Sequence, residues 1–245
     1  MKILLFVFIT FGILVGYSQS IEVLKKSNLE IVPELHKFDF ILASNDSNKF
    51  QFVATLLVKE KAVSSSIEKL YLSSRIQANL LGANCFSFKS FSHLDSSGET
   101  SLIINCYRAT DSSLIEAKEV FEKNVVYVFG KEKEGDKSIF FNINNEKREI
   151  SSGSYFRIGL NQGETVMINK GGPIGGATVW LNWEKDKQPY FYTLSGFGMN
   201  NWEQQVTANI GFGTVNSIAF TTGKINRILD NSLGFLLIYV LKQGN

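Results

Sequence analysis

The chain has 245 residues, of which 44% are apolar and 20% charged, a composition typical of globular proteins. Its 25 Lys and Arg residues nearly balance its 23 Asp and Glu residues. The formal net charge of only +2 argues against nucleic acid or an anionic membrane surface as the main partner. The length allows one large domain or two small ones, and the three prolines argue against long disordered regions.

Residues 1–20 have the layout of a secretory signal peptide. Met1 and Lys2 form a short positive region, residues 3–15 are almost wholly apolar, and residues 18–20 are a small-x-small triplet. The apolar stretch is shorter than the roughly 20 residues that a membrane-spanning helix needs, and an uncleaved anchor is the alternative. We therefore expect residues 1–20 to be removed. The mature protein is then exported to the periplasm, the outer surface or the medium, with no integral membrane span after cleavage.

Residues 22–110 are predicted to form a small α+β domain, an α/β sandwich with the element order β-β-α-β-β. The helix is marked by a capping box at residues 65–68 and by Gly82, which stands where a helix commonly ends in a left-handed residue. One face of the sheet is left for this helix to cover. The four strand-like runs cover residues 38–43, 50–59, 84–90 and 100–107.

The two cysteines, Cys85 and Cys106, fall on the last two of these strands. In an oxidising compartment they could form one disulfide. If the two strands form a hairpin whose register places the thiols opposite each other, the Cβ atoms are close enough for a bridge. A register shifted by one residue would instead place them on different faces of the sheet, and two buried free thiols are the alternative.

Residues 111–123 are predicted to form a connecting helix, and residues 124–245 an all-β sandwich domain. After residue 124 the apolar residues alternate with period two, and turn signals separate short runs. This pattern is typical of a sandwich of short antiparallel strands. The apolar runs at 217–222 and 235–241 are expected to form its last strands.

The first resemblance to a known family covers residues 76–107. It is carried by Ala78, by the turn at residues 81–84 (Leu-Gly-Ala-Asn) and by the strand ending at residues 105–107 (Asn-Cys-Tyr). This stretch resembles a small bacterial α/β family that includes proteins proposed to bind heavy metals and the Rcs envelope-stress sensor lipoprotein. The chain lacks the extra cysteine pairs of that sensor and any evident metal ligands, so the resemblance implies a fold and not a function.

The second resemblance covers residues 125–197. It is carried by residues 126–129 (Val-Tyr-Val-Phe), residues 152–156 (Ser-Gly-Ser-Tyr-Phe), the turn at Gly163, and residues 190–192 (Tyr-Phe-Tyr). This stretch is similar to a transthyretin-like β-sandwich domain family of unknown function found on bacterial envelope proteins and lipoproteins. That family has no established catalytic residues, so the resemblance implies a sandwich fold in the envelope.

The motifs predict no catalytic residues, no cofactor and no metal site. The glycine-rich segment 171–176 lacks the Gly-Lys-Ser/Thr of a phosphate-binding loop, and no G-x-S-x-G nucleophile elbow is present. His36 and His93 are isolated, and with the two cysteines they give no ligand cluster. The remaining candidates are carboxylates among basic residues, which we expect in solvated turns rather than as paired glycosidase acids: Glu132, Glu134, Asp136, Glu146 and Glu149.

Four aromatic residues, Trp180, Trp183, Tyr190 and Tyr192, are the candidate contacts for a ligand or partner. An odd number of positions separates Trp180 from Trp183, so on one strand they face opposite sides of the sheet. One indole is therefore expected in the core, and the other is expected to be exposed and able to stack on a sugar or a peptide.

These features give three hypotheses for function. The leading one is a non-enzymatic binding or interaction module of the bacterial envelope, whose partner is an envelope protein or a glycan. The second is a cryptic hydrolase or metal-handling envelope protein. The third is a structural or assembly component of the envelope, which would be marked by a large exposed apolar patch or an open sheet edge.

Overall fold

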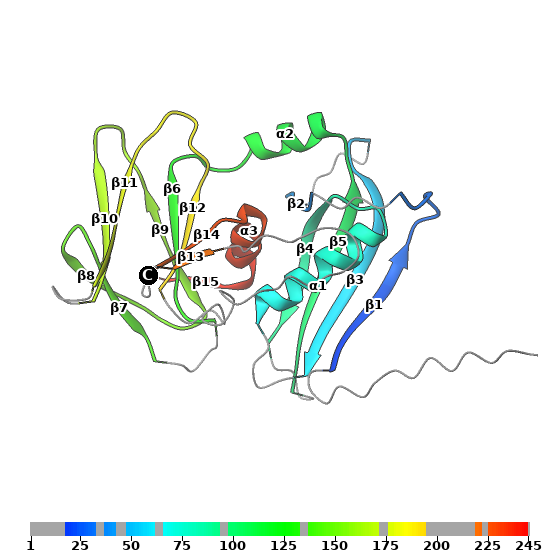
Figure 1. Ribbon diagram of the computed structural model, residues 1–245, viewed down its shortest axis with the longest axis horizontal. Helices are drawn as coiled ribbons and strands as arrows, with labels where there is room; N and C mark the ends of the chain where they lie inside the picture. The colour runs from blue at the N-terminus through cyan, green and yellow to red at the C-terminus, as the bar shows by residue number, and fades with distance from the viewer. Residues whose placement is uncertain are drawn as a thin grey trace, which may run out of the picture.

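The protein is rich in β-strands and has three helices in the part of the chain that the computed structural model describes (Figure 1). The described residues are 18–32, 37–42, 48–61, 66–93, 98–132, 137–171, 176–194, 219–221 and 225–244. Residues 1–17 of the predicted leader, His36 and residues 172–175 of the glycine-rich segment lie outside these ranges, whereas residues 18–20 of that leader are described as part of a strand. No helix within them is both long and apolar enough to cross a membrane.

A five-stranded sheet forms the first part of the molecule, with α1 (Ile67–Leu80) packed on one face (Figure 1). Its strand order is β1-β3-β5-β4-β2. The strands are β1 (Ser18–Lys26), β2 (Asp39–Phe40), β3 (Gln51–Lys61), β4 (Cys85–Ser92) and β5 (Glu99–Arg108). The helix ends as predicted, because Gly82 has a φ of +84°. It begins one residue later than a capping box at residues 65–68 implies, because Ser66 is the N-cap and its side chain accepts the N–H of Lys69.

Two strands of this sheet differ from the sequence prediction. We predicted no strand at residues 18–26, yet β1 pairs antiparallel with β3 from Ser18 to Lys26, with a register shift at Leu24. Residues 38–43 were predicted as a full strand, but only Asp39 and Phe40 pair, and they lie parallel to β4 at the opposite edge. The local sequence pattern could not predict which residues form either edge strand, because each pairs with a strand that is distant in the chain.

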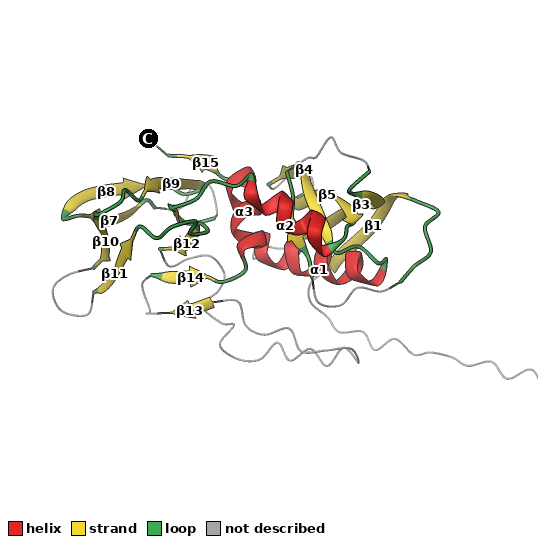
Figure 2. Cartoon of the chain, turned by 90° about the horizontal axis from the view of Figure 1, so that it is seen from above, coloured by secondary structure: helices red, strands yellow, loops and turns green. Residues whose placement is uncertain are grey.

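After α2 (Asp111–Glu119), the chain forms two sheets that pack face to face (Figures 1 and 2). The four-stranded sheet has the order β11-β10-β7-β8, and the six-stranded sheet has the order β13-β14-β12-β6-β9-β15. Val126 and Val128 of one sheet share an apolar cluster with Ile168 and Leu181 of the other. The strands are β6 (Val125–Phe129), β7 (Ile139–Ile143), β8 (Glu146–Ile150), β9 (Ser154–Gly159), β10 (Thr165–Lys170), β11 (Ala177–Asn182), β12 (Tyr190–Thr193), β13 (Ala219–Thr221), β14 (Asn226–Ile228) and β15 (Lys242–Gln243).

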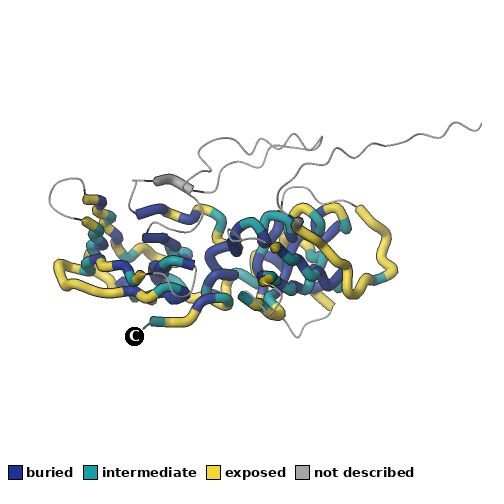
Figure 3. Tube along the Cα trace, turned by 90° about the horizontal axis from the view of Figure 1, so that it is seen from below, coloured by how far each residue is buried: buried dark blue, intermediate teal, exposed yellow. Residues whose placement is uncertain are grey.

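The predicted strand at residues 235–241 is wrong, because this segment is helical in α3 (Asn231–Val240). The helix lies between the five-stranded and six-stranded sheets (Figures 1 and 2). Leu233, Phe235 and Leu236 are buried within a cluster that includes residues of both sheets. A helix packed on more than one side is apolar nearly all round, so it loses the one-sided stripe by which helices are recognised. Buried residues continue from the five-stranded sheet through α3 into the six-stranded sheet (Figure 3).

Candidate functional site

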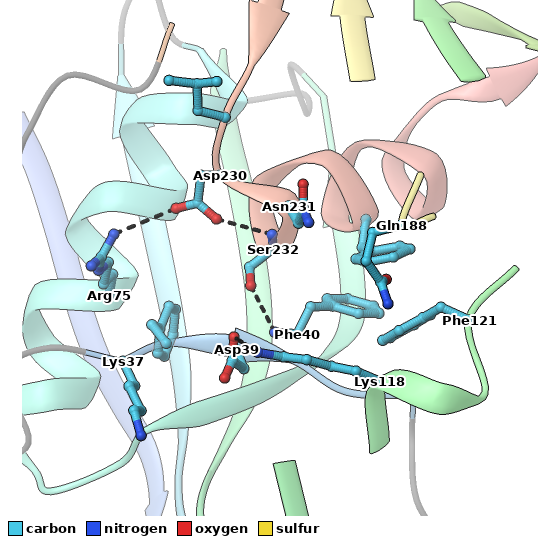
Figure 4. Close-up of a pocket in the computed structure, with 13 residues that line it drawn as sticks. Lys37, Asp39, Phe40, Arg75, Lys118, Phe121, Gln188, Asp230, Asn231 and Ser232 are labelled. Atoms are coloured by element: carbon cyan, nitrogen blue, oxygen red, sulfur yellow. Dashed lines mark hydrogen bonds and ion pairs between the residues drawn. The ribbon is translucent and has the colours of Figure 1, made fainter. Parts of the chain in front are cut away.

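A cavity of about 610 Å³, which we call the junction pocket, opens where α3 meets β2, α1 and the segment after α2 (Figure 4). Its lining residues come from both the five-stranded sheet region and the later part of the chain. They are Lys37, Phe38, Asp39, Phe40, Arg75, Lys118, Phe121, Gln188, Leu229, Asp230, Asn231, Ser232 and Phe235. Cavities between parts of a protein are common places for ligands.

Packed phenylalanine rings form the apolar wall of the junction pocket. The rings of Phe121 and Phe235 stack with their centroids 3.9 Å apart, and the Phe40 ring lies 6.0 Å from that of Phe235. The Phe40 ring also meets Phe86 of β4 nearly edge-on, at 5.3 Å. Because these rings are buried and fixed by one another, they offer a rigid surface for an apolar or aromatic group.

Asp230 fixes the start of α3 against α1 beside this wall. One carboxylate oxygen, Oδ1, accepts the N–H groups of Ser232 and Leu233 at 2.9 and 3.2 Å, which caps the helix. The other, Oδ2, accepts the Tyr71 hydroxyl at 2.8 Å and Nη1 of Arg75 at 3.4 Å. Burial first, and then the charge of Asp230, raise the pKa of Tyr71, so its hydroxyl remains a donor.

Charged side chains surround the mouth of the junction pocket (Figure 4). Lys118 Nζ lies 2.9 Å from Asp39 Oδ1, and Lys37 Nζ lies 2.6 Å from Asp111 Oδ1. With Arg75, the lining residues carry three cations against the two carboxylates of Asp39 and Asp230. Asp111 lies outside the lining but pairs with Lys37, so each of the three cations has a carboxylate partner. The mouth is therefore polar and balanced in charge, while the interior wall is aromatic.

The lining combines aromatic, charged and hydroxyl side chains. The 13 lining residues include neither histidine nor cysteine. The Ser232 hydroxyl oxygen accepts the Phe40 N–H at 3.0 Å, which ties β2 to the first turn of α3. What the junction pocket offers a ligand is apolar contact at its wall and fixed charges at its mouth.

A second cluster of ionisable groups lies at the first turn of α1, and it corrects one prediction. Glu132 was expected in a solvated turn, but it is buried, and its Oε1 accepts the N–H of Ile67. Burial raises its pKa to about 8, and the charges of Glu68 and Glu60 act in the same direction. Burial likewise raises the pKa of Glu68 to about 6. In the described ranges, no three His, Cys, Asp or Glu side chains are grouped so that they could hold a metal ion.

The other predicted carboxylates do not join this cluster. Glu146 and Glu149 are exposed on β8, as expected for a solvated turn and its flanks. Glu134 and Asp136 lie outside the described residues. His93 is a described residue, and its ring stacks on Phe91 with the centroids 6.2 Å apart.

Both cysteines are free thiols in the structure, and the register of the strands explains why. Cys85 lies opposite Tyr107, and Phe86 lies opposite Cys106. The two thiols are therefore one position out of register, which places them on different faces of the sheet. Cys85 packs in a small cluster with Ile41, whereas Cys106 belongs to the main core.

The four aromatic candidates do not converge on one site. The Trp180 side chain points away from the core and is 65% exposed, whereas Trp183 is partly buried against the cluster between the two sheets. Tyr192 is buried, and Tyr190 stacks on it with the ring centroids 6.3 Å apart. Trp180 is thus the exposed indole, and Trp183, which follows the last residue of β11, is intermediate rather than fully in the core.

The residues of the junction pocket were not predicted from the sequence. Their positions follow from α3, whose helical nature was not recognised. One available signal was Asp230, a residue favoured at helix N-caps, placed directly before an apolar run. Capping alone would have predicted the helix, but not the elements that pack on it.

Three comparisons with known proteins complete this description. No family model matches the chain, and neither a curated protein nor a solved structure matches it. Its function is therefore inferred from its own residues.

Proposed function

We propose that this protein is an exported, non-enzymatic binding module of the bacterial envelope that holds an amphipathic ligand in the junction pocket. Export is supported by the signal-peptide layout of residues 1–20. The proposal includes two compact units, a small α+β unit and a β-sandwich unit, joined by α2 and α3.

The junction pocket is the observation that carries this proposal. Its wall is formed by rings that are already packed, and its charged groups are already held by partners, as the Asp39–Lys118 contact at 2.9 Å shows. Little order must be gained when a ligand enters such a preformed site. A ligand with one aromatic group and one carboxylate would place its ring against the wall and its carboxylate beside Lys118 at the mouth.

A matched pair of lysine substitutions tests the proposal. Lys118 and Lys49 each form an exposed ion pair, at 2.9 and 2.7 Å, with side chains 45% and 42% exposed, but only Lys118 lines the junction pocket. Lys118→Ala and Lys49→Ala should both change stability little. Short peptides with one aromatic residue and one carboxylate, titrated by calorimetry, should bind the wild type and Lys49→Ala, and bind Lys118→Ala more weakly.

Two results would count against this function. If the peptides bound Lys118→Ala and Lys49→Ala with equal affinity, the binding site would lie outside the junction pocket. Turnover of the peptides, followed by mass spectrometry during the titration, would contradict a non-enzymatic role.

A structural or assembly role is the second candidate, because β1 is an open sheet edge. It is the first strand of its sheet and pairs only with β3 among the described residues. Ile21, Val23 and Leu24 on this strand are 38%, 42% and 50% exposed. An edge with apolar side chains can add a strand from another chain. Lysine at Ile21 and Val23 would then disrupt an assembly that sedimentation detects for the wild type.

A further inference from the structure

The four-stranded sheet lies at one end of the molecule (Figure 1). The sheet packs against the six-stranded sheet through its inner face, where Ile168 and Leu181 are buried. Side chains alternate along a strand, so the neighbours of these residues point outward. No described element lies over this outer face (Figures 1 and 2).

Trp180 is the dominant side chain of this face. It lies on β11 opposite Met167 of β10, and 65% of it is exposed. Thr178 and Asn182, two positions away on either side, point in the same direction, about 6.8 Å along the strand from Trp180. The exposed indole is thus bordered at both ends by a polar side chain.

Hydrogen bonds between strands hold these polar groups in place. The Thr165 hydroxyl donates to Oδ1 of Asn182 at 2.6 Å, and Nδ2 of Asn169 donates to Oγ1 of Thr178 at 2.7 Å. Nδ2 of Asn142, on the next strand, lies 3.5 Å from Oδ1 of Asn169 and extends the row across β7. The amide and hydroxyl groups therefore form two ordered rows, one on each side of the indole.

The face is also neutral where the indole lies. The outward residues of β10 and β11 are Thr165, Met167, Asn169, Thr178, Trp180 and Asn182, and none is charged. Charge appears only on the far strand β8, where Lys147 Nζ lies 4.3 Å from the centre of the Phe140 ring. A neutral, hydrogen-bonding surface disfavours nucleic acid, and its polar rows disfavour a purely apolar protein partner.

We propose that this face binds a neutral glycan chain, with one sugar ring stacked on the Trp180 indole. The apolar face of a sugar ring matches an exposed indole, and the hydroxyl groups at its rim can both donate and accept hydrogen bonds. The amide of Asn182 and the hydroxyl of Thr178 lie where such groups would reach them. This site is separate from the junction pocket, and glycan binding here does not depend on ligand binding there.

The test uses Trp180→Ala, Trp180→Phe and a matched control, Ile115→Ala. Ile115 on α2 is also 65% exposed, so its truncation removes an equally exposed, though smaller, apolar side chain outside this sheet. The probes are two neutral hexasaccharides, one of β-1,4-linked glucose and one of β-1,4-linked N-acetylglucosamine. Calorimetry on the folded chain measures binding, and the two probes separate a glucan from an amino-sugar backbone as the source.

We expect at least one probe to bind the wild type and Ile115→Ala equally, and to bind Trp180→Ala about tenfold or more weakly. Trp180→Phe should keep part of the affinity, because it retains an aromatic face. No binding of either probe, or equal binding to Trp180→Ala, would overturn the proposal. A wild-type dimer that Trp180→Ala dissociates would also overturn it, by making this face a contact between copies. None of these results would contradict the separate proposal that a ligand binds in the junction pocket.

Discussion

Glu132 links two distant parts of the chain through one hydrogen bond. Its carboxylate accepts the N–H of Ile67, the first residue of α1, and so occupies the place of a capping group at the helix start. The same carboxylate lies close enough to Glu68 and Glu60 for their charges to raise its pKa. A carboxylate in this position is expected to be protonated near neutral pH and to lose that proton in mild alkali.

The stability of the protein should therefore fall as the pH rises toward 8. Burial raises the pKa of Glu132 from 4.5 to about 8, so the folded chain favours the protonated form. The stabilisation is complete below pH 4.5 and is lost as the pH rises through about 8. Glu132→Gln keeps an acceptor and carries no charge, so it should remove most of this loss, which is on the order of 5 kcal/mol. Urea unfolding at acidic and alkaline pH measures the effect.

Glu119→Gln is the matched control for this experiment. Glu119 is exposed on α2 and pairs with Lys123 on the surface, so its charge should matter little. If Glu132→Gln showed the same decline in stability with pH as the wild type, the carboxylate would be solvated in solution.

Gly234 allows α3 to approach β12 closely. A Cβ atom at this position would lie 2.4 Å from Cγ of Phe191, which is fully buried and cannot move aside. Gly234→Ala should therefore destabilise the fold by about 2 kcal/mol or more, as overpacking does. Gly159→Ala is the control, because a Cβ atom added there would meet no other atom within 4 Å. Equal stability of the two variants in urea would show that α3 lies farther from β12.

At the scale of elements, the register of β4 and β5 decides the state of the cysteines. The pairing of Cys85 with Tyr107 puts the two thiols on opposite faces of one sheet. Burial raises the pKa of both thiols, so the reactive thiolate is disfavoured in the folded chain. Both features favour free and unreactive cysteines even in an oxidising compartment.

A thiol assay with and without urea tests this register. The folded protein should show no reactive thiol, and the unfolded protein should show both, Cys85 and Cys106. The mass of the unfolded, alkylated chain should correspond to two modified cysteines. An unmodified mass that changes only after reduction would reveal a disulfide and a different register.

Elements with a local signal could be predicted from the sequence, and elements defined by their neighbours could not. The strand at 125–129 appears where the pattern placed it, and α1 begins one residue after the position that the capping box implied. β1, β2 and α3 were missed or misassigned, because each takes its form from contacts with residues far along the chain. The junction pocket depends on two of these three elements, so local pattern could not predict it. Trp180 could be predicted as a candidate because alternation along one strand is local.

At the scale of the whole molecule, α3 makes one continuous core out of two parts. Phe235 stacks on Phe121 at 3.9 Å, lies 6.0 Å from Phe40 of the five-stranded sheet and meets Phe191 of the six-stranded sheet edge-on at 5.2 Å. A shared core of this kind couples the parts, because neither can lose its packing without exposing the surface of the other.

Phe235→Ala should both destabilise the protein and uncouple its two parts. The cost is expected to be about 3–5 kcal/mol, and calorimetry should show two transitions in place of one. Phe141→Ala is the matched control, since Phe141 is also buried but belongs only to the cluster between the two later sheets. It should lower stability to a similar degree, mostly within the later part. Two transitions already present in the wild type would contradict the coupling.

The position of α3 along the chain also affects the order in which the protein can fold. The ribosome makes the five-stranded sheet region first, but Phe40 lies against a helix whose first residue is 231. More than half of the polypeptide must therefore follow before this aromatic surface is covered. A chain that cannot complete its core early stays incompletely folded during synthesis, which is the state that a secretion channel for unfolded polypeptides accepts.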